Sequence, residues 1–451
     1  MSKDKLILLH LSDIHFNKGS GTTFDLDTDL RNELEKDAKS ISDRLSGVHA
    51  ILITGDIAFA GLSEEYEKAA AWLKKLCTKV GCSFEAIWST PGNHDIDRST
   101  VEKEPLLQDI HNNLRTIPVN DIDENIKKYF LNKTAADLLL RPIQNYNRFA
   151  SRYGCEIDSD KFYWVHDLRL NDGSTLRLHG LSSALISNQF DNETDQKLIL
   201  SSYQVKFERE SGVEHLSLCH HPPDWLRDRD EVEKKFHKRV RIQLFGHKHE
   251  YFIREIDGAV RIIAGATHPD RKEKKWLPRY NVLSIHITND GETRKLILEI
   301  YPRVWSEEDN IFKADYDSKG ADVRSFSFNL DPWIETPAKS VCVAGKEAEI
   351  ANPTSAGTDD QIDAEPRMSP QRKLTYRFLG LPYSKRLEIS LKLGLIHDGD
   401  MNLQDIELFR QVFRRARESE NLAGLWDEVE KAYGAEAQGE NPFLDKHSKE
   451  G

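Results

Sequence analysis

The residues of this sequence that could do chemistry stand in five short polar clusters, each directly after an apolar stretch. The clusters read Asp13-x-His15, Gly55-Asp56, Gly92-Asn93-His94-Asp95, His220-His221 and Gly246-His247-x-His249. Their groups mix hard oxygen donors with borderline nitrogen donors, which suits manganese, iron or zinc better than calcium or magnesium. There are too many donors for one catalytic ion that keeps an open position, whereas two ions bridged by a carboxylate can use them. The clusters therefore predict a two-metal site that begins at Asp13 and His15.

The elements that must position these clusters are strands and helices in alternation. Short runs rich in Val, Ile and Leu alternate with longer amphipathic segments up to about residue 300, which is typical of an α/β domain. The candidate strands are 5–11, 48–54, 85–89, 175–180, 215–219, 240–245, 260–265, 280–287 and 294–300. The carboxyl ends of such strands share one edge of a sheet, so clusters that are far apart in sequence can converge there. Side chains two positions apart in an extended segment share a face, so Asp13 and His15 can reach the same ion.

Helices are expected between these strands. The segment 63–80 has Ser63 as a candidate cap, acidic residues in its first turn and lysines toward its end, in agreement with the helix dipole. Residues 122–153 have the pattern of an inserted set of helices, and we place the whole insertion at about 101–160. Such an insertion could form part of a lid over the site.

The composition changes near residue 336. Residues 336–371 are rich in Ala, Pro, Ser, Thr, Gly and Asp without a sustained period, which predicts a flexible linker. Residues 372–435 again carry apolar residues at helical spacing, and one stripe consists of Leu403, Ile406, Phe409, Val412 and Phe413. We therefore expect a catalytic domain at 1–335, a linker, a small helical domain at 372–435 and a tail at 436–451. A helical domain this small can depend on a protein partner or on self-association.

The charge balance argues against a global electrostatic attraction for nucleic acid. The 451 residues include 63 Lys and Arg against 75 Asp and Glu, so only a local basic patch can bind phosphate. One candidate patch follows the last histidine pair and consists of Arg271, Lys272, Lys274, Lys275, Trp276 and Arg279. Basic side chains beside an aromatic ring fit the phosphate and base of a nucleotide or single strand. The alternative is a solvated turn.

Cysteine usage and hydropathy predict the compartment. The five cysteines form neither CxxC pairs nor a regular framework, which favours a reducing compartment such as the cytoplasm. No apolar run approaches the roughly 20 residues that span a bilayer, so we expect no membrane insertion.

The ordered set DxH, GD, GNHD, HH and GHxH resembles the calcineurin-like metallophosphoesterase superfamily over roughly residues 1–305. The segments HLSDIHF and GNHDIDRS are most similar to its class III cyclic-nucleotide phosphodiesterase branch. The resemblance implies an α/β fold with two sheets flanked by helices (α/β/β/α), to which the small all-α domain is added. It implies two ions that share Asp56, the first held by Asp13, His15 and His249 and the second by Asn93, His220 and His247.

The resemblance also assigns the residues around the phosphate. It implies that His94 lies beside the phosphate and that Asp95 orients it, although Asp95 could instead cap a helix. His220 is the expected ligand of the HHPP segment because it is closest to the strand end, with His221 as the alternative.

Three functions remain open. The first is a phosphodiesterase that uses two ions, preferably manganese, to hydrolyse a nucleotide or nucleic-acid phosphoester by in-line attack of a bridging hydroxide. The second is suggested by the C-terminal helices, which resemble adaptor domains of bacterial conflict and defence systems. It is a DNA or RNA nuclease effector of antiviral defence, recruited through residues 372–435. The third is a scaffold protein with a vestigial metal site.

Overall fold

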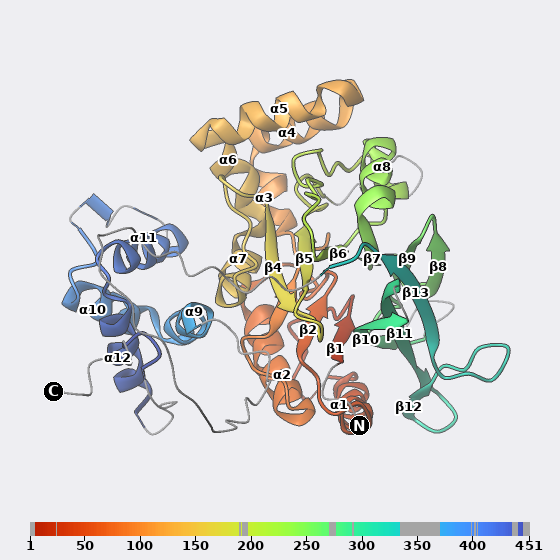
Figure 1. Cartoon of the computed structure of the whole chain (residues 1–451). Coiled ribbons are helices and arrows are strands. Elements are labelled where there is room, and N and C mark those ends of the chain that lie inside the picture. The colour runs from red at the N-terminus through yellow and green to blue at the C-terminus, as the bar shows by residue number, and fades with distance from the viewer. Residues whose placement is uncertain are drawn as a thin grey trace, which may run out of the picture.

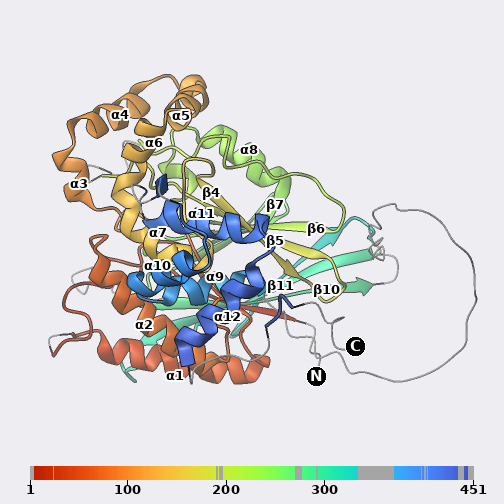
Figure 2. The ribbon, with the colours of Figure 1, turned by 90° about the vertical axis from the view of Figure 1, so that its left-hand side faces the viewer.

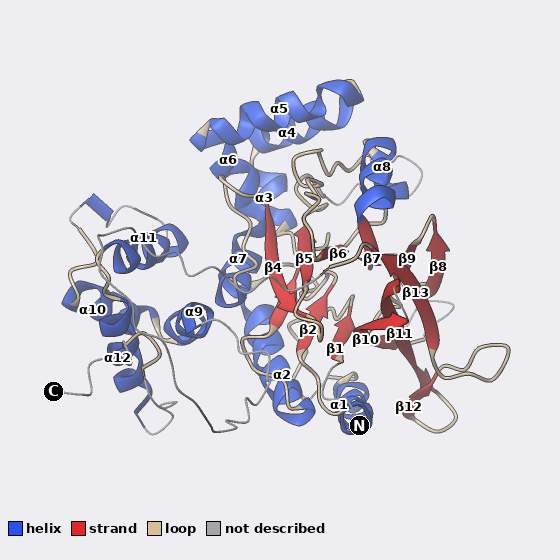
Figure 3. Cartoon of the chain, in the orientation of Figure 1, coloured by secondary structure: helices blue, strands red, loops and turns tan. Residues whose placement is uncertain are grey.

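The computed structural model describes residues 5–23, 25–188, 191, 197–269, 277–290, 293–333, 370–397, 399–400, 403, 405–434 and 441–444. Within this part, the chain forms two mixed β-sheets flanked by helices, followed by a helical C-terminal region (Figures 1 and 3). This confirms the fold class predicted from the sequence. Residues 336–369 of the predicted linker lie outside the described residues.

The first sheet has the order β12-β11-β10-β1-β2-β3, and β13 pairs with β11. Its strands are β1 (Leu6–Leu11), β2 (Ala50–Ile53), β3 (Ile87–Ser89), β10 (Arg279–Asp290), β11 (Thr293–Ser306), β12 (Ile311–Ala314) and β13 (Arg324–Leu330). β1 lies parallel to β2 and antiparallel to β10, and every residue of β1 is buried. Burial on both faces explains its nearly continuous apolar sequence LILLHL.

The second sheet has the order β4-β5-β6-β7-β9-β8. Its strands are β4 (Tyr163–Arg169), β5 (Thr175–Leu181), β6 (Val213–Cys219), β7 (Val240–Phe245), β8 (Phe252–Ile256) and β9 (Ala259–Ile263). The strands β5, β6, β7 and β9 are parallel, so the chain leaves β6 and β7 at the same edge of the sheet. This edge carries the two histidine clusters.

Two long helices, α1 (Thr28–Leu45) and α2 (Ser63–Val80), pack beside the first sheet (Figure 1). The cap position of α2 is Leu62, so the expectation that Ser63 caps this helix is wrong. Instead, the Glu65 carboxylate accepts hydrogen bonds from the backbone N–H groups of Ala60 and Leu62, at 2.9 and 3.1 Å. A carboxylate three residues into the helix satisfies donors at its start, which is the role a capping side chain would otherwise have.

A helical insertion joins the two sheets. It contains α3 (Arg98–Lys103), α4 (Pro105–Thr116), α5 (Ile122–Leu131), α6 (Lys133–Leu140) and α7 (Gln144–Ala150), with 3₁₀ turns η1 (Val119–Asp121), η2 (Arg141–Ile143) and η3 (Ser151–Tyr153). Between β6 and β7 the chain forms η4 (Pro223–Trp225) and α8 (Arg229–Arg239). The role of the insertion as a lid stays a prediction.

The C-terminal region contains α9 (Pro370–Gly380), α10 (Tyr383–Lys392), α11 (Asp405–Glu418) and α12 (Leu422–Tyr433). These helices enclose their own apolar core, to which Phe409, Val412 and Phe413 of the predicted stripe contribute. This core is separate from the core of the two sheets.

The C-terminal helices lie against the two-sheet part of the chain (Figure 2). Arg372 of α9 donates to the backbone carbonyls of Glu85 and Ile87, at 3.1 and 3.2 Å, and its guanidinium lies 4.5 Å from the ring centre of Trp88. Arg410 of α11 forms an ion pair with Asp158 at 2.9 Å. These contacts hold the helices beside β3 and the end of the insertion. None of the helices that the structure describes combines the length and apolarity needed to cross a membrane.

Candidate metal centre

The loops that follow β1, β2, β3, β6 and β7 bring the five polar clusters together. Four groups of side chains each place their donor atoms within 4.8 Å of one another. The groups are Asp13–His15–His249, His15–Asp56–His94, Asp13–Asp56–His220 and His220–His221–His247. Because these groups share members, they form one continuous centre.

Backbone hydrogen bonds join the loops of the centre. The N–H of Asp13 donates to the carbonyl of Gly55 at 3.1 Å, and the N–H of His15 donates to the carbonyl of Asp56 at 3.0 Å. In the second sheet, the N–H of Gly246 donates to the carbonyl of His220 at 3.0 Å. These hydrogen bonds help to fix the relative positions of the loops.

Several of the predicted ligands have a strained backbone. Asp13, His15, Asp56 and His249 have φ between 52° and 53°, and His247 has φ of 71°. Holding a non-glycine residue in this left-handed region raises the free energy of the folded state by about 1–3 kcal/mol, and such residues cluster at functional sites. The side chains of Asp13 and His15 do lie together with that of His249, as expected. Their backbone is left-handed, however, so the extended geometry expected from the sequence is wrong.

Two glycines allow the loops to approach the carboxylates closely. A Cβ atom on Gly92 would lie 2.1 Å from Oδ1 of Asp56, and one on Gly246 would lie 2.1 Å from Oγ of Ser12 and 2.9 Å from Oδ2 of Asp13. No larger residue fits at either position without moving a carboxylate of the centre.

The centre has two halves, the group Asp13–His15–His249 and the group His220–His221–His247. Asp56 lies between them. Its Oδ2 atom lies 3.3 Å from Nε2 of His15 and 3.3 Å from Nε2 of His220. Its Oδ1 atom accepts a hydrogen bond of 2.8 Å from the backbone N–H of His94. One carboxylate therefore contacts histidines from both sheets.

Asp13 belongs to two of the four groups, one with His15 and His249 and one with Asp56 and His220. Its Oδ1 atom lies 3.3 Å from Nε2 of His249, and its Oδ2 atom accepts hydrogen bonds from Ser12 Oγ at 2.5 Å and from the His247 N–H at 3.2 Å. The side chain is fully buried.

The two adjacent histidines have different surroundings. Nε2 of His220 lies 3.0 Å from Oδ1 of Asn93, and its Nδ1 lies 2.7 Å from the carbonyl of Thr54, to which it donates. Nδ1 of His221 bonds to Oγ of Ser183 at 2.9 Å, and its buried Nε2 has no hydrogen-bond partner. His220 therefore contacts both Asn93 and Asp56. His221 has a buried Nε2 atom that is free to bind a metal ion.

Charge coupling decides which groups in the centre carry protons. Burial favours the neutral acid form of Asp56, but the positive charge of His220 and hydrogen bonds from both neighbouring histidines outweigh it and hold the pKa of Asp56 well below its usual range. Burial also opposes charge on His220, yet the Asp56 carboxylate raises the pKa of His220 to about 9. The pKa of His15 rises for the same reason. Protons on histidines thus balance the carboxylates, and cations that bind here would displace them.

His247 and His221 are neutral near pH 7. Burial lowers the pKa of His247 to about 3, and the charge of His220 acts in the same direction. Burial likewise places the pKa of His221 well below its usual value. Neutral imidazoles and ionised carboxylates are the forms that ligate metals, so the donor set fits two transition ions.

His94 and Asp95 lie on opposite sides of their turn. His94 is partly exposed, and its Nδ1 lies 2.7 Å from the carbonyl of Phe59. Asp95 is fully buried and accepts from the N–H groups of Gly92 and Ala58, at 2.9 and 3.0 Å. The Phe59 carbonyl, and not Asp95, therefore orients the His94 ring. Asp95 does not cap a helix either, because α3 begins after Asp97.

The structure leaves the predicted basic patch mostly undescribed. Arg271, Lys272, Lys274, Lys275 and Trp276 lie outside the described residues. Arg279 begins β10, forms an ion pair with Asp315 at 2.5 Å and lies 4.9 Å from the ring centre of Tyr251. The described contacts of Arg279 are therefore structural.

Comparison with known families identifies the chain. Residues 6–251, more than half of the sequence, match the family model of calcineurin-like phosphoesterases. The chain belongs to the calcineurin-like phosphoesterase family. Residues 370–431 of this phosphoesterase match the model of the GTPase-associated adaptor domain. The sequence-based assignments of a calcineurin-like phosphoesterase and of a C-terminal adaptor domain are confirmed.

Solved structures that are similar to this phosphoesterase include Vps29 of Entamoeba histolytica in complex with zinc, at 10% identity and a TM-score of 0.27, covering 72% of this chain and 99% of that one. A second is a predicted phosphoesterase of Streptococcus pneumoniae, with the same identity, coverage and TM-score. A third is the purple acid phosphatase PPD1 of yellow lupin, at 11% identity and a TM-score of 0.35, covering 76% of this chain and 58% of that one. No curated protein matches the sequence.

Sequence reasoning missed residues that support the centre of this phosphoesterase. His268 donates from Nδ1 to the carbonyl of Ile14 at 2.8 Å, and its own carbonyl lies 3.3 Å from Nδ1 of His15. The ring of Trp225 lies 4.1 Å from the ring of His247. His268 follows the candidate strand 260–265 closely, so the rule that found the other clusters could also have found it.

Proposed function

We propose that the chain is a dinuclear-metal-dependent phosphodiesterase that hydrolyses a phosphoester of a nucleotide or nucleic acid. The observation that supports this most is Asp56, whose Oδ2 atom lies 3.3 Å from a histidine of each half of the centre. A carboxylate in this position can bridge two ions.

The ligand sets of the proposal follow the two halves. Asp13, His15 and His249 would hold one ion, Asn93, His220 and His247 the other, and Asp56 both. When bound, the two cations supply positive charge that neutralises the phosphoryl group and lowers the pKa of water. Manganese is the metal we expect, with iron and zinc as alternatives.

His94 would exchange a proton with the leaving group. Its Nδ1 faces a carbonyl that can only accept, so the neutral ring carries its proton there and has a lone pair at Nε2. Burial lowers the pKa of His94, and the negative charge of Asp56 partly opposes this effect. The ring can therefore accept a proton from water at Nε2 and donate that proton to the leaving oxygen, a contribution typically of order 10²- to 10⁴-fold.

Asp95 would act as a positioning residue. It is held by the backbone N–H groups of Gly92 and Ala58 and by the hydroxyl of Tyr66, the last at 2.8 Å. These bonds tie the loop that carries Asn93 to the loop that carries Asp56.

Phe59 supports the choice of a nucleotide or nucleic-acid substrate. Its side chain is 49% exposed, and its ring centre lies 5.2 Å from that of His94. An exposed aromatic ring beside the proposed phosphate position can stack on a base, which contributes about 1–3 kcal/mol per base.

The test is hydrolysis of bis(p-nitrophenyl) phosphate by the full chain with added Mn²⁺. We expect Asp56→Asn to abolish turnover, because one change removes a ligand of both ions. Asp43→Asn is the control, since Asp43 is an exposed partner of Lys39 on α1, outside the centre. Full activity in metal-stripped Asp56→Asn protein would contradict the proposal.

The adaptor-domain match favours a second, narrower candidate, a nuclease effector that is recruited through its C-terminal helices. A panel of single-stranded DNA, duplex DNA, RNA and cyclic nucleotides with Mn²⁺ separates this candidate from a nucleotide phosphodiesterase. Turnover of any of these substrates that Asp56→Asn abolishes counts against a scaffold with a vestigial site.

A further inference from the structure

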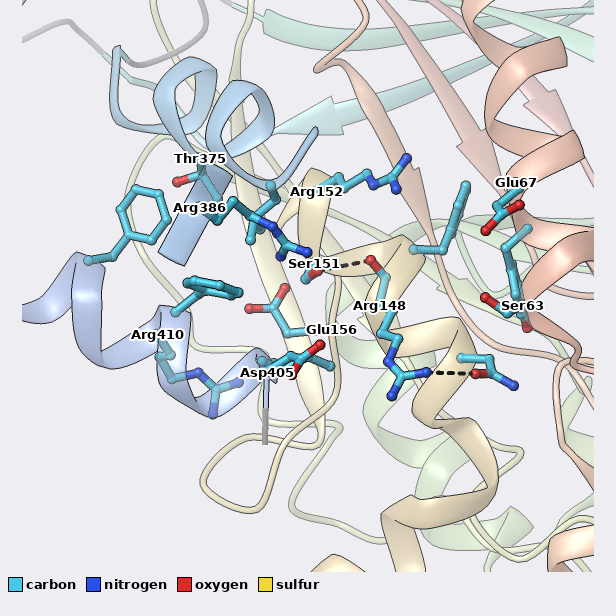
Figure 4. Close-up of a pocket in the computed structure, with 18 of the residues that line it drawn as sticks. Ser63, Glu67, Arg148, Ser151, Arg152, Glu156, Thr375, Arg386, Asp405 and Arg410 are labelled. Atoms are coloured by element: carbon cyan, nitrogen blue, oxygen red, sulfur yellow. Dashed lines mark hydrogen bonds between the residues drawn. The ribbon is translucent and has the colours of Figure 1, made fainter. Parts of the chain in front are cut away.

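A pocket lies between the catalytic part of the chain and the C-terminal helices, apart from the metal centre (Figure 4). Its volume is about 360 Å³, which is within the range of sites for small ligands and too small for a folded protein. The insertion contributes α7, η3 and the residues just after them, and the C-terminal helices contribute α9, α10 and α11. A ligand here would contact both parts of the chain at once.

The pocket is rich in arginine. Five of its lining residues are arginines, namely Arg148, Arg152, Arg386, Arg410 and Arg417. They face three carboxylates, those of Glu67, Glu156 and Asp405. Burial raises the pKa of the Glu156 carboxyl. The pocket therefore carries an excess of positive charge in a protein whose net charge is −12.

Of these five arginines, Arg410 alone forms an ion pair with a residue that the structure describes. Arg410 is paired with Asp158, whereas neither Arg152 nor Arg386 forms an ion pair with any residue that the structure describes. Nε of Arg386 is buried without a hydrogen-bond partner, and the guanidinium extends across the pocket toward Ser151 (Figure 4). Arg152 and Arg386 line the pocket from the two sides of the domain boundary, and Arg152 extends toward the side of Glu67 (Figure 4). Two cationic side chains that line one pocket can both pair with an extended anion.

The remaining wall is apolar and aromatic. It consists of Phe149 of the insertion with Leu379, Ile406, Phe409 and Phe413 of the C-terminal helices. Phe409 and Phe413 also belong to the core of the C-terminal helices, and the guanidinium of Arg386 lies 4.5 Å from the ring centre of Phe409. The wall offers apolar surface that the planar base of a nucleotide can use and a simple inorganic anion cannot.

We propose that this pocket binds a phosphorylated nucleoside, whose phosphates pair with Arg152 and Arg386 and whose base packs against the phenylalanine wall. The bound nucleotide joins the adaptor domain to the catalytic domain. It also contacts Tyr66, which lines the pocket and donates its hydroxyl to Asp95 behind the metal centre. The site does not depend on the metal ions.

Binding is measured by calorimetry with the full-length Asp56→Asn variant and no added metal, so that the probe is not hydrolysed. The probes are ADP and GDP, with pyrophosphate and adenosine as the phosphate and base components. We expect at least one nucleotide to bind at least tenfold more tightly than either component. No saturation by either nucleotide at 1 mM, or equal affinity for pyrophosphate, would overturn the proposal.

Variants on each side of the boundary locate the site. Arg152→Gln and Arg386→Gln, each in the Asp56→Asn background, should each weaken binding about tenfold or more, because each removes a charge-assisted hydrogen bond. Arg414→Gln is the matched control, since Arg414 lies on α11 outside the pocket and pairs with Glu418. Unchanged binding in both pocket variants would place the nucleotide elsewhere and overturn the proposal. These readouts involve no catalysis, so their failure is distinguishable from failure of the phosphodiesterase proposal.

Discussion

Substitution of Gly92 by alanine tests how tightly the loops hold the Asp56 carboxylate, which we propose bridges two ions. The new Cβ would lie 2.1 Å from Oδ1 of Asp56, 2.7 Å from its backbone nitrogen and 2.8 Å from its carboxyl carbon. All three distances are shorter than Cβ contacts in real proteins, so Asp56 or the Gly92 loop must move by about 1 Å. Both are buried and hydrogen-bonded, so the movement has no easy route.

The expected effect has two parts. Overpacking of a buried site costs about 1–3 kcal/mol of folding free energy. A misplacement of about 1 Å at a reacting centre costs on the order of 100-fold in rate, and disturbance of groups that orient ligands costs about 10- to 100-fold in metal affinity. Gly92→Ala should therefore lose far more activity than stability. The folded variant keeps every proposed ligand, but the Asp56 carboxylate is displaced.

The assay compares Mn²⁺ affinity, turnover of bis(p-nitrophenyl) phosphate and the midpoint of thermal unfolding. Gly399→Ala serves as the control, because a Cβ at Gly399 has no atom within 4 Å and needs no positive φ. If Gly92→Ala kept the metal affinity and the turnover of the wild-type protein, the close approach to Asp56 would have no functional role.

The remaining predictions concern single histidines. His220→Gln should lower Mn²⁺ affinity and turnover by about 100-fold, and His221→Gln should lower them by about tenfold, because only His220 contacts both Asn93 and Asp56. Metal titration and steady-state kinetics measure both effects. If His221→Gln had the larger effect, His221 would be the ligand. Burial lowers the pKa of His111 to about 3, so this residue contributes full stability above its unfolded pKa of about 6.5 and loses it as pH falls toward 3. The loss should be about 2 kcal/mol at pH 5, and His111→Leu should flatten the decline of the unfolding midpoint between pH 7 and 5 in metal-free protein; an unchanged slope would contradict this.

The convergence of the five clusters could be predicted because its signal in the sequence is local. Each cluster follows a buried apolar strand, and the end of a strand is where a polar side chain can leave the core. β1, with all six residues buried and Asp13 just beyond it, is the clearest case. Strands with weaker patterns were missed, for example β8, whose residues are exposed or half-buried at a sheet edge.

The geometry within the centre could not be predicted in the same way. The sequence gives no sign that the aspartates and His15 come from one sheet and His220 from the other, because this depends on how the sheets pack. The left-handed backbone at Asp13 and Asp56 is stabilised by tertiary hydrogen bonds and not by local preference. The role of Phe59 as the partner of His94 likewise depends on a contact between residues 35 positions apart.

The contact between the two domains was also outside the reach of sequence patterns. Arg372 follows the predicted linker, and its partners are backbone carbonyls of Glu85 and Ile87, which have no sequence signature. The arginine pocket consists of residues from several separate segments and becomes visible only when they are packed together.

The most direct test of the account is anomalous X-ray diffraction from crystals of the full chain grown with Mn²⁺. The account predicts two manganese peaks per molecule, with Asp56 between them, one adjoining Asp13 and His249 and the other Asn93 and His220. A single peak, or peaks that do not contact Asp56, would contradict the two-metal centre.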